Sequence, residues 1–134
     1  MITLLYAGLL SIIYVMLGFY VVKNRRMHRV SLGVGHNVPA LERAVRIHGN
    51  FGENVPLFLV LLTLIEMNAA SPWLIHVFGI MMIIGRIFHA LGIRHKQGAS
   101  YERIIGMVLT WLSILGCAFT TLWLVLRNGV FLTF

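Results

Sequence analysis

The amino-acid sequence predicts an all-α integral membrane protein, folded as a bundle of four transmembrane helices. Of its 134 residues, 59% are hydrophobic and only 11% are charged, which lies far outside the composition of ordinary soluble domains. The chain also contains four long apolar stretches, and a helix needs about 20 apolar residues to cross the hydrocarbon layer. We expect one membrane domain over residues 1–134, with helices at about 2–22, 41–70, 72–93 and 102–126.

Local signals separate these helices in order. The first helix, 2–22, contains no charged residue and is not preceded by a cleavage signal, so we expect it to be retained. The segment "SLGVGHNVPA" (Ser31 to Ala40) then breaks the helix with glycine, asparagine and proline. The second helix begins near Leu41 and includes Pro56, which membrane helices tolerate. The segments "NAASPW" and "GASYER" end the second and third helices.

Basic residues gather on one side of the predicted bundle. The connection between helices two and three contains none, whereas the other two connections hold or adjoin ten of the eleven lysines and arginines. The positive-inside rule therefore places the basic connections in the cytoplasm and both termini on the opposite side. Topology thus explains the net charge of +7, and we expect no nucleic-acid partner. The ten residues are Lys23, Arg25, Arg26, Arg29, Arg43, Arg46, Arg86, Arg94, Lys96 and Arg103.

A polar stripe marks the second helix where it enters the membrane. Its members follow the spacing i, i+3, i+7, i+10, which confines them to an arc of about 80°; they are Arg43, Arg46, Asn50 and Glu53. Such a stripe can face headgroups, form a hydrogen-bonded seam between helices, or line a binding site. Polar groups this deep normally face a cavity or a partner. Arg86 and His89 repeat the i, i+3 spacing on the third helix.

These side chains suit a small anionic ligand that also carries an ammonium group. Arginines can clamp carboxylates, Glu53 can bind the ammonium, and Asn50 can bind a peptide group. A small peptide with two carboxylates and one ammonium fits this description, but the residues alone do not single out one compound. No H-E-x-x-H spacing indicates a metal site, and Cys117, inside an apolar stretch, is expected in the core.

Two motifs resemble those of a known family. The stretch "ERAVRIHGNFGENVP" (Glu42 to Pro56) resembles the helix-two signature of the MAPEG family, the membrane-associated proteins in eicosanoid and glutathione metabolism. The segment "GRIFHALG" (Gly85 to Gly92) is similar to the motif of the family's third helix. Length and loop charges match over essentially the whole chain, most closely in the style of the bacterial inner-membrane branch. The resemblance implies a homotrimer in that membrane, with glutathione bound between subunits on the cytoplasmic side; in that membrane, the charge distribution described above makes both termini periplasmic.

The resemblance also implies roles for individual residues. Arg103 stands near the family's arginine that is proposed to stabilise the glutathione thiolate, although it could instead anchor the helix at the interface. Lys23 stands near a basic position at the end of helix one. The positions that match glutathione contacts are Arg46, Asn50, Glu53 and His89.

The activity implied is that of a glutathione-dependent transferase or peroxidase-like protein, whose thiolate attacks a lipophilic small molecule arriving from the bilayer. Two departures leave catalysis an open question. Ile93 occupies a tyrosine position of the family, and Ile104 occupies a serine position of prostaglandin E synthase. One alternative is a non-enzymatic glutathione- or lipid-binding protein of the same fold. A small transporter is disfavoured, because the first helix lacks the carboxylate that such exporters use.

Overall fold

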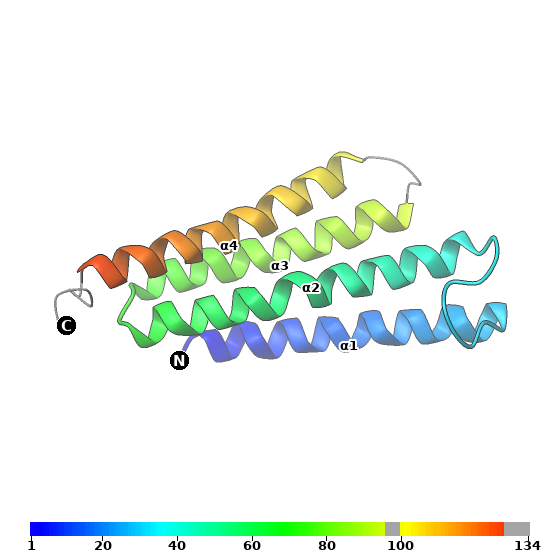
Figure 1. The fold of residues 1–134 in the computed structure, drawn as a ribbon, viewed down its shortest axis with the longest axis horizontal. Coiled ribbons are helices and arrows are strands. Elements are labelled where there is room, and N and C mark those ends of the chain that lie inside the picture. Colours follow the sequence, from blue (N-terminus) through cyan, green and yellow to red (C-terminus); the bar gives the residue numbers. More distant parts are fainter. Residues whose placement is uncertain (96–99, 128–134) are drawn as a thin grey trace.

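The computed structural model describes residues 1–95 and 100–127, and those residues form four long helices (Figure 1). The helices are α1 (Thr3–His28), α2 (Pro39–Met67), α3 (Pro72–His95) and α4 (Tyr101–Arg127). No strand occurs in the two described ranges, and each helix is long and apolar enough to cross a membrane. The predicted all-α class with four membrane helices is therefore confirmed.

The helices lie side by side, and each runs antiparallel to the next along the chain (Figure 1). The N-terminus and the turn between α2 and α3 lie at one end of the bundle, and the α1–α2 loop lies at the other. α1 packs mainly on α2, and α3 packs mainly on α4, while α2 and α3 each contact all three other helices. The predicted polar stripe is therefore carried by one of the two helices that contact every other helix of the bundle.

The ends of α1 and α2 follow from local chemistry. α1 continues past residue 22 to His28, and Arg29 follows in the left-handed conformation with φ of 54°. Lysine and arginine are good helix formers, and their charge is favourable near a helix C-terminus, so the basic residues after 22 extend the helix. α2 begins at Pro39, whose ring suits the first helical position, and continues through Pro56.

Polar contacts fasten the end of the bundle that holds the N-terminus. The Glu66 carboxylate, near the end of α2, accepts hydrogen bonds from the backbone N–H groups of Ile2 and Thr3, the latter at 2.9 Å. A carboxylate is favourable at a helix N-terminus because of the partial positive charge there. The Tyr6 hydroxyl lies 2.8 Å from Nδ1 of His76 on α3. α1 is thus joined at this end to both α2 and α3.

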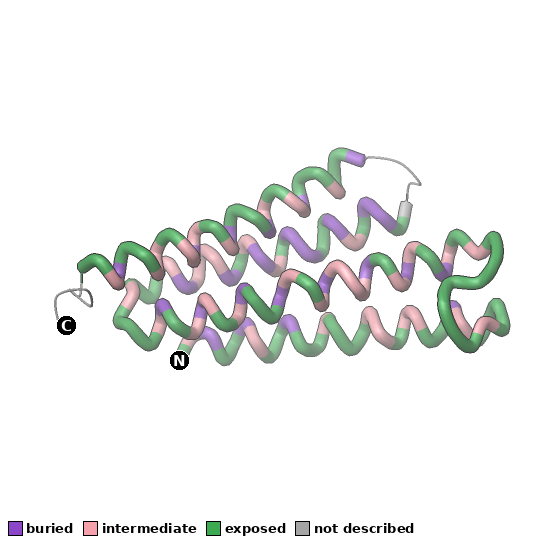
Figure 2. Tube along the Cα trace, in the orientation of Figure 1, coloured by how far each residue is buried: buried purple, intermediate pink, exposed green. Residues whose placement is uncertain are grey.

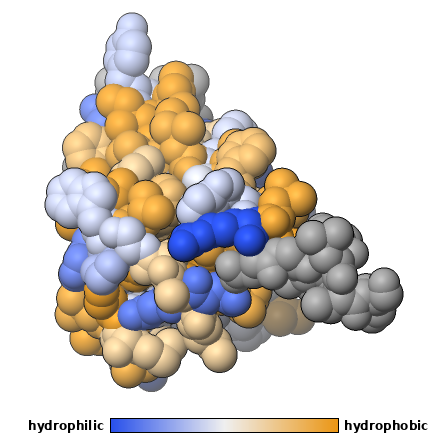
Figure 3. All heavy atoms as spheres, turned by 90° about the vertical axis from the view of Figure 1, so that its left-hand side faces the viewer, coloured by the Kyte–Doolittle hydropathy of each residue, from blue (hydrophilic) through white to orange (hydrophobic). Residues whose placement is uncertain are grey.

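The buried core lies between the helices, whereas their outer faces are apolar and exposed (Figure 2). Cys117 is fully buried in this core, as predicted. Figure 3, which looks onto the end with the N-terminus, shows hydrophobic side chains on the outside beside a smaller number of hydrophilic ones. Large exposed apolar side chains occur on every helix, for example Phe19, Leu57, Ile87 and Trp111. An outer surface of this kind suits lipid or another subunit.

Candidate functional site

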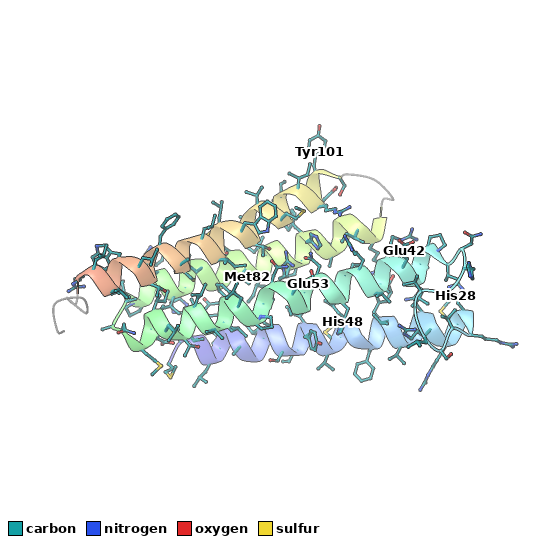
Figure 4. The ribbon with its side chains drawn as sticks, viewed as in Figure 1. His28, Glu42, His48, Glu53, Met82 and Tyr101 are labelled. Carbon is teal, nitrogen blue, oxygen red and sulfur yellow. The ribbon has the colours of Figure 1, made fainter. Side chains whose placement is uncertain are left out.

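The residues predicted to bind a ligand on α2 line one hollow on its surface. The hollow has a volume of about 380 Å³, and Val34 of the α1–α2 loop forms part of its lining. Arg46, Asn50 and Glu53 all line it. Glu42 and Glu53 mark its two limits along α2 (Figure 4). The space is large enough for a small ligand, since ligand pockets commonly measure about 300–1,000 Å³.

Glu53 is exposed although it lies in the part of α2 that a membrane would enclose. Counting about 20 residues back from Met67 places the hydrocarbon boundary near residue 47. Asn50 and Glu53 lie inside this boundary, and the exposed Arg46 lies at its edge. Neither charged residue forms an ion pair with any residue that the structure describes. Because a charged group facing lipid is costly, this face of α2 needs a ligand or another subunit to cover it.

Arg86 of α3 is buried beside these residues, with only 4% of its surface exposed. Its Nη1 donates hydrogen bonds to Oδ1 and to the backbone oxygen of Asn50, at 2.7 and 3.3 Å. Its Nε donates to Oγ1 of Thr110 on α4 at 3.1 Å, and Nη2 donates to the same oxygen. One guanidinium therefore connects three helices, and all of its hydrogen-bond acceptors within 1–95 and 100–127 are uncharged.

Small residues let α3 and α4 approach closely around this arginine. A Cβ atom added at Gly85 would lie 3.0 Å from the backbone oxygen of Gly106 and equally close to Thr110 Oγ1. A Cβ atom added at Gly106 would collide with the backbone of His89. Glycine is therefore needed at Gly106, whereas a side chain at Gly85 would require the neighbouring atoms of α4 to shift by a few tenths of an ångström. The Thr110 hydroxyl also donates to the Gly106 oxygen at 2.8 Å, which fixes its orientation.

His89 lies one turn after Arg86 on α3 and is buried, with 3% of its surface exposed. The guanidinium groups of Arg86, Arg103 and Arg46 all lie close enough to act electrostatically on its ring. These three arginines come from α3, α4 and α2, respectively. The structure thus brings predicted site residues of three helices into one region, although His89 does not line the hollow itself.

Arg103 lies in the first turn of α4 and is half-buried. Its backbone N–H donates to Ser100 Oγ at 3.3 Å, and its backbone packs against Gly92 of α3. Lys23 is exposed on α1. Neither Lys23 nor Arg103 lines the hollow, and the same is true of Arg43, the first residue of the predicted stripe.

Two residues of this region were not assigned to the site from the sequence. The sequence contains one signal for Arg86. An arginine inside an apolar helix needs hydrogen-bond acceptors from other helices, and Arg86 lies on the same helix face as His89. Thr110 offers no such signal. Threonine is common in membrane helices, where its hydroxyl bonds to its own backbone, and nothing in the surrounding sequence marks this one.

The other histidines lie elsewhere in the bundle. His48 stacks on Tyr14 of α1, with 4.5 Å between the ring centroids. His76 is engaged with Tyr6 near the N-terminus. Lys96, which the sequence analysis counts among the basic residues, lies outside the described residues. In the ranges that the structure describes, no group of three His, Cys, Asp or Glu side chains could hold a metal ion.

Comparison with known proteins gives two findings. The model of the MAPEG family matches residues 3–123 of the chain. The chain is also 37% identical over 123 residues to "Inner membrane protein YecN" of Escherichia coli strain K12, a match that covers 92% of each chain. The protein of the same name from Escherichia coli O6:H1 strain CFT073 matches equally well. No solved structure matches the chain significantly.

Proposed function

Because this chain belongs to the MAPEG family, we propose that it is a bacterial inner-membrane protein that binds glutathione and activates its thiol toward apolar electrophiles. The observation that carries the proposal is the hollow on α2, where Arg46, Asn50 and Glu53 border a space of about 380 Å³. The name of the Escherichia coli relatives supports the inner-membrane location and gives no activity.

The spacing of the charges suits glutathione. Arg46 and Glu53 are seven residues apart, which corresponds to about 10 Å along a helix. An extended tripeptide spans about the same distance. Arg46 can bind a carboxylate and Glu53 can bind the ammonium, with Asn50 between them for a peptide or carboxylate group. Since neither charge has an ion-pair partner in the described part of the chain, a zwitterionic ligand would satisfy both at once.

A second copy of the chain would cover the hollow. Arg46 and Glu53 are exposed in a single chain, and charged groups on a membrane helix normally face a cavity or a partner. We therefore propose a homotrimer in which glutathione lies between neighbouring subunits on the cytoplasmic side. His89 and Arg103 do not line the hollow of their own chain, which suits a site that a neighbouring subunit completes.

Arg103 is the proposed catalytic residue, with the role of stabilising the thiolate. A free thiol with a pKa near 8.5 is only a few per cent anionic at neutral pH. Arg103 lies in the first turn of α4, where the helix N-terminus adds a partial positive charge to that of the guanidinium. About 2 kcal/mol of preferential stabilisation would bring the thiol pKa near 7. The thiolate would then attack an apolar electrophile that arrives from the lipid.

A non-enzymatic glutathione- or lipid-binding protein is the second candidate function. It is favoured by Ile93, which is buried on α3 and stands at a tyrosine position of the family. Ile104 adds to this, because it stands where prostaglandin E synthase carries a serine. A small transporter has less support, since no acidic residue occurs in α1.

Retention on glutathione-agarose, followed by a conjugation assay with an aromatic halide, tests the proposal on purified protein in detergent. An enzyme is retained, is eluted by free glutathione, and forms the conjugate. A binding protein is retained without forming conjugate, and a transporter of unrelated cargo is not retained. A failure of the protein to be retained would contradict the proposed function.

A further inference from the structure

We propose that Arg86 and Thr110 lock the side chain of Asn50 so that it offers a bound ligand only hydrogen-bond donors, and therefore selects a carbonyl or carboxylate oxygen at this point. The inference rests on the proposed function, because it specifies how the hollow on α2 recognises glutathione. Arg86 and Thr110 do not line the hollow. They act through Asn50 and are therefore positioning residues.

The first step is the direction of the bond between Arg86 and Asn50. A guanidinium carries five N–H donors and no acceptor, so the amide atom that faces it at 2.7 Å has to be the oxygen, Oδ1. The backbone oxygen of Asn50 accepts a second bond from the same nitrogen at 3.3 Å. Turning the amide over would place N–H groups against N–H groups, which is unfavourable in a buried setting.

The second step is what holds Arg86 in place. The Thr110 hydroxyl uses its single proton in the hydrogen bond to the Gly106 oxygen at 2.8 Å, so only its lone pairs face Arg86. Those lone pairs accept from Nε, at 3.1 Å, and from Nη2. Arg86 is 4% exposed and Thr110 is fully buried. The direction of each hydrogen bond is therefore fixed: Thr110 on α4 accepts from Arg86 on α3, and Arg86 donates to Asn50 on α2.

The third step is the free end of the Asn50 amide. Since its oxygen faces Arg86, its nitrogen lies on the opposite side of the amide, and no described residue accepts a hydrogen bond from it. The neighbouring Asn54 behaves differently, because its amide nitrogen donates to the backbone oxygen of Asn50 at 2.8 Å. Asn50 is half-buried and lines the hollow. Its N–H groups are thus available to a ligand there.

The consequence is a fixed pattern of recognition along α2. Arg46 and Asn50 present donors, and Glu53 presents an acceptor. A matching ligand needs two acceptor groups followed by one donor. Glutathione supplies carboxylate or peptide oxygens for the first two positions and an ammonium for the third. A ligand with an N–H group opposite the Asn50 amide nitrogen would meet a second donor there, because the amide oxygen is turned toward Arg86.

The variant Asn50→Asp separates this role from simple packing. Its side chain keeps the shape and the oxygen that accepts from Arg86, but it has no N–H group and adds negative charge toward the ligand. In calorimetric titration with glutathione, we expect it to bind at least about tenfold more weakly than the wild type, with unchanged elution volume and helical content. Affinity within about twofold of the wild type would overturn the inference and leave Asn50 only the task of holding Arg86.

A matched pair of substitutions at Thr110 tests whether Thr110 and Arg86 position Asn50, without changing the lining of the hollow. The pair also tests the inference if Asn50→Asp does not fold. Thr110→Val removes the acceptor, whereas Thr110→Ser keeps it. We expect the valine variant to bind glutathione at least about threefold more weakly and the serine variant to match the wild type. Wild-type affinity in Thr110→Val would overturn the inference. If the wild type itself does not bind glutathione, that result contradicts the proposed function and also overturns this inference.

Discussion

The Oδ1 atom of Asn50 accepts a hydrogen bond of 2.7 Å from Nη1 of Arg86 and joins the ligand-facing helix α2 to α3. Arg86 in turn donates to Thr110 of α4. The bond thus links a surface that lines the hollow to two helices behind it. Substitutions on α3 and α4 should therefore affect ligand binding on α2 without contacting the ligand.

The same contacts make a prediction about stability. Thr110→Val leaves N–H groups of the buried Arg86 without an acceptor, and should lower the free energy of unfolding by about 1–3 kcal/mol. In an Arg86→Met background the same substitution should cost much less, because methionine needs no acceptor. A double-mutant cycle, measured by unfolding in detergent, checks this. Equal costs in both backgrounds would show that the two side chains are not coupled.

The second prediction concerns topology. The α1–α2 loop lies at the end of the bundle opposite the N-terminus (Figure 1), and basic residues flank that loop. A fluorescent protein that matures only in the cytoplasm should therefore be dark when fused after Phe134 and bright when inserted at Gly33. The reverse pattern, with a bright fusion at Phe134 and a dark insertion at Gly33, would place the basic loop outside the cytoplasm.

The third prediction concerns assembly. The exposed charges of Arg46 and Glu53 on a membrane helix are best covered by further copies of the chain. In mild detergent the particle should have three times the 15.1 kDa mass of one chain, as measured by light scattering corrected for bound detergent. A monomeric mass under conditions that preserve glutathione binding would rule out a site formed between subunits.

The helices and the polar stripe could be predicted because they depend on local pattern alone. Hydropathy marks the four helices, and helical spacing places Arg46, Asn50 and Glu53 on one arc. The bond between Asn50 and Arg86 could not be predicted in this way, because it depends on how three helices pack. That packing in turn depends on glycines such as Gly106, whose importance is visible only once the neighbouring backbone is in place.

The fourth prediction separates binding from thiol activation. If Arg103 stabilises the thiolate, Arg103→Leu should keep glutathione affinity within a few-fold of the wild type but lose the ultraviolet absorbance of bound thiolate. The apparent pKa of the conjugation rate should rise, because the thiol loses a cation that favours its anion. Arg103→Lys serves as the control that keeps a positive charge. An unchanged pH profile in Arg103→Leu would assign Arg103 to anchoring the helix and favour the non-enzymatic candidate.

The central claim is that the hollow on α2 binds glutathione through its deep carboxylate, and titration of Glu53→Gln against the wild type tests it most directly. Glu66→Gln is the matched control, because Glu66 also lies on α2 but bonds to the N-terminus of α1 and does not line the hollow. The account predicts saturable binding to the wild type, unchanged binding to Glu66→Gln, and a loss of about 1.5–3 kcal/mol in Glu53→Gln with the oligomer intact. Equal affinity of Glu53→Gln and the wild type would contradict the claim and leave the stripe a structural role.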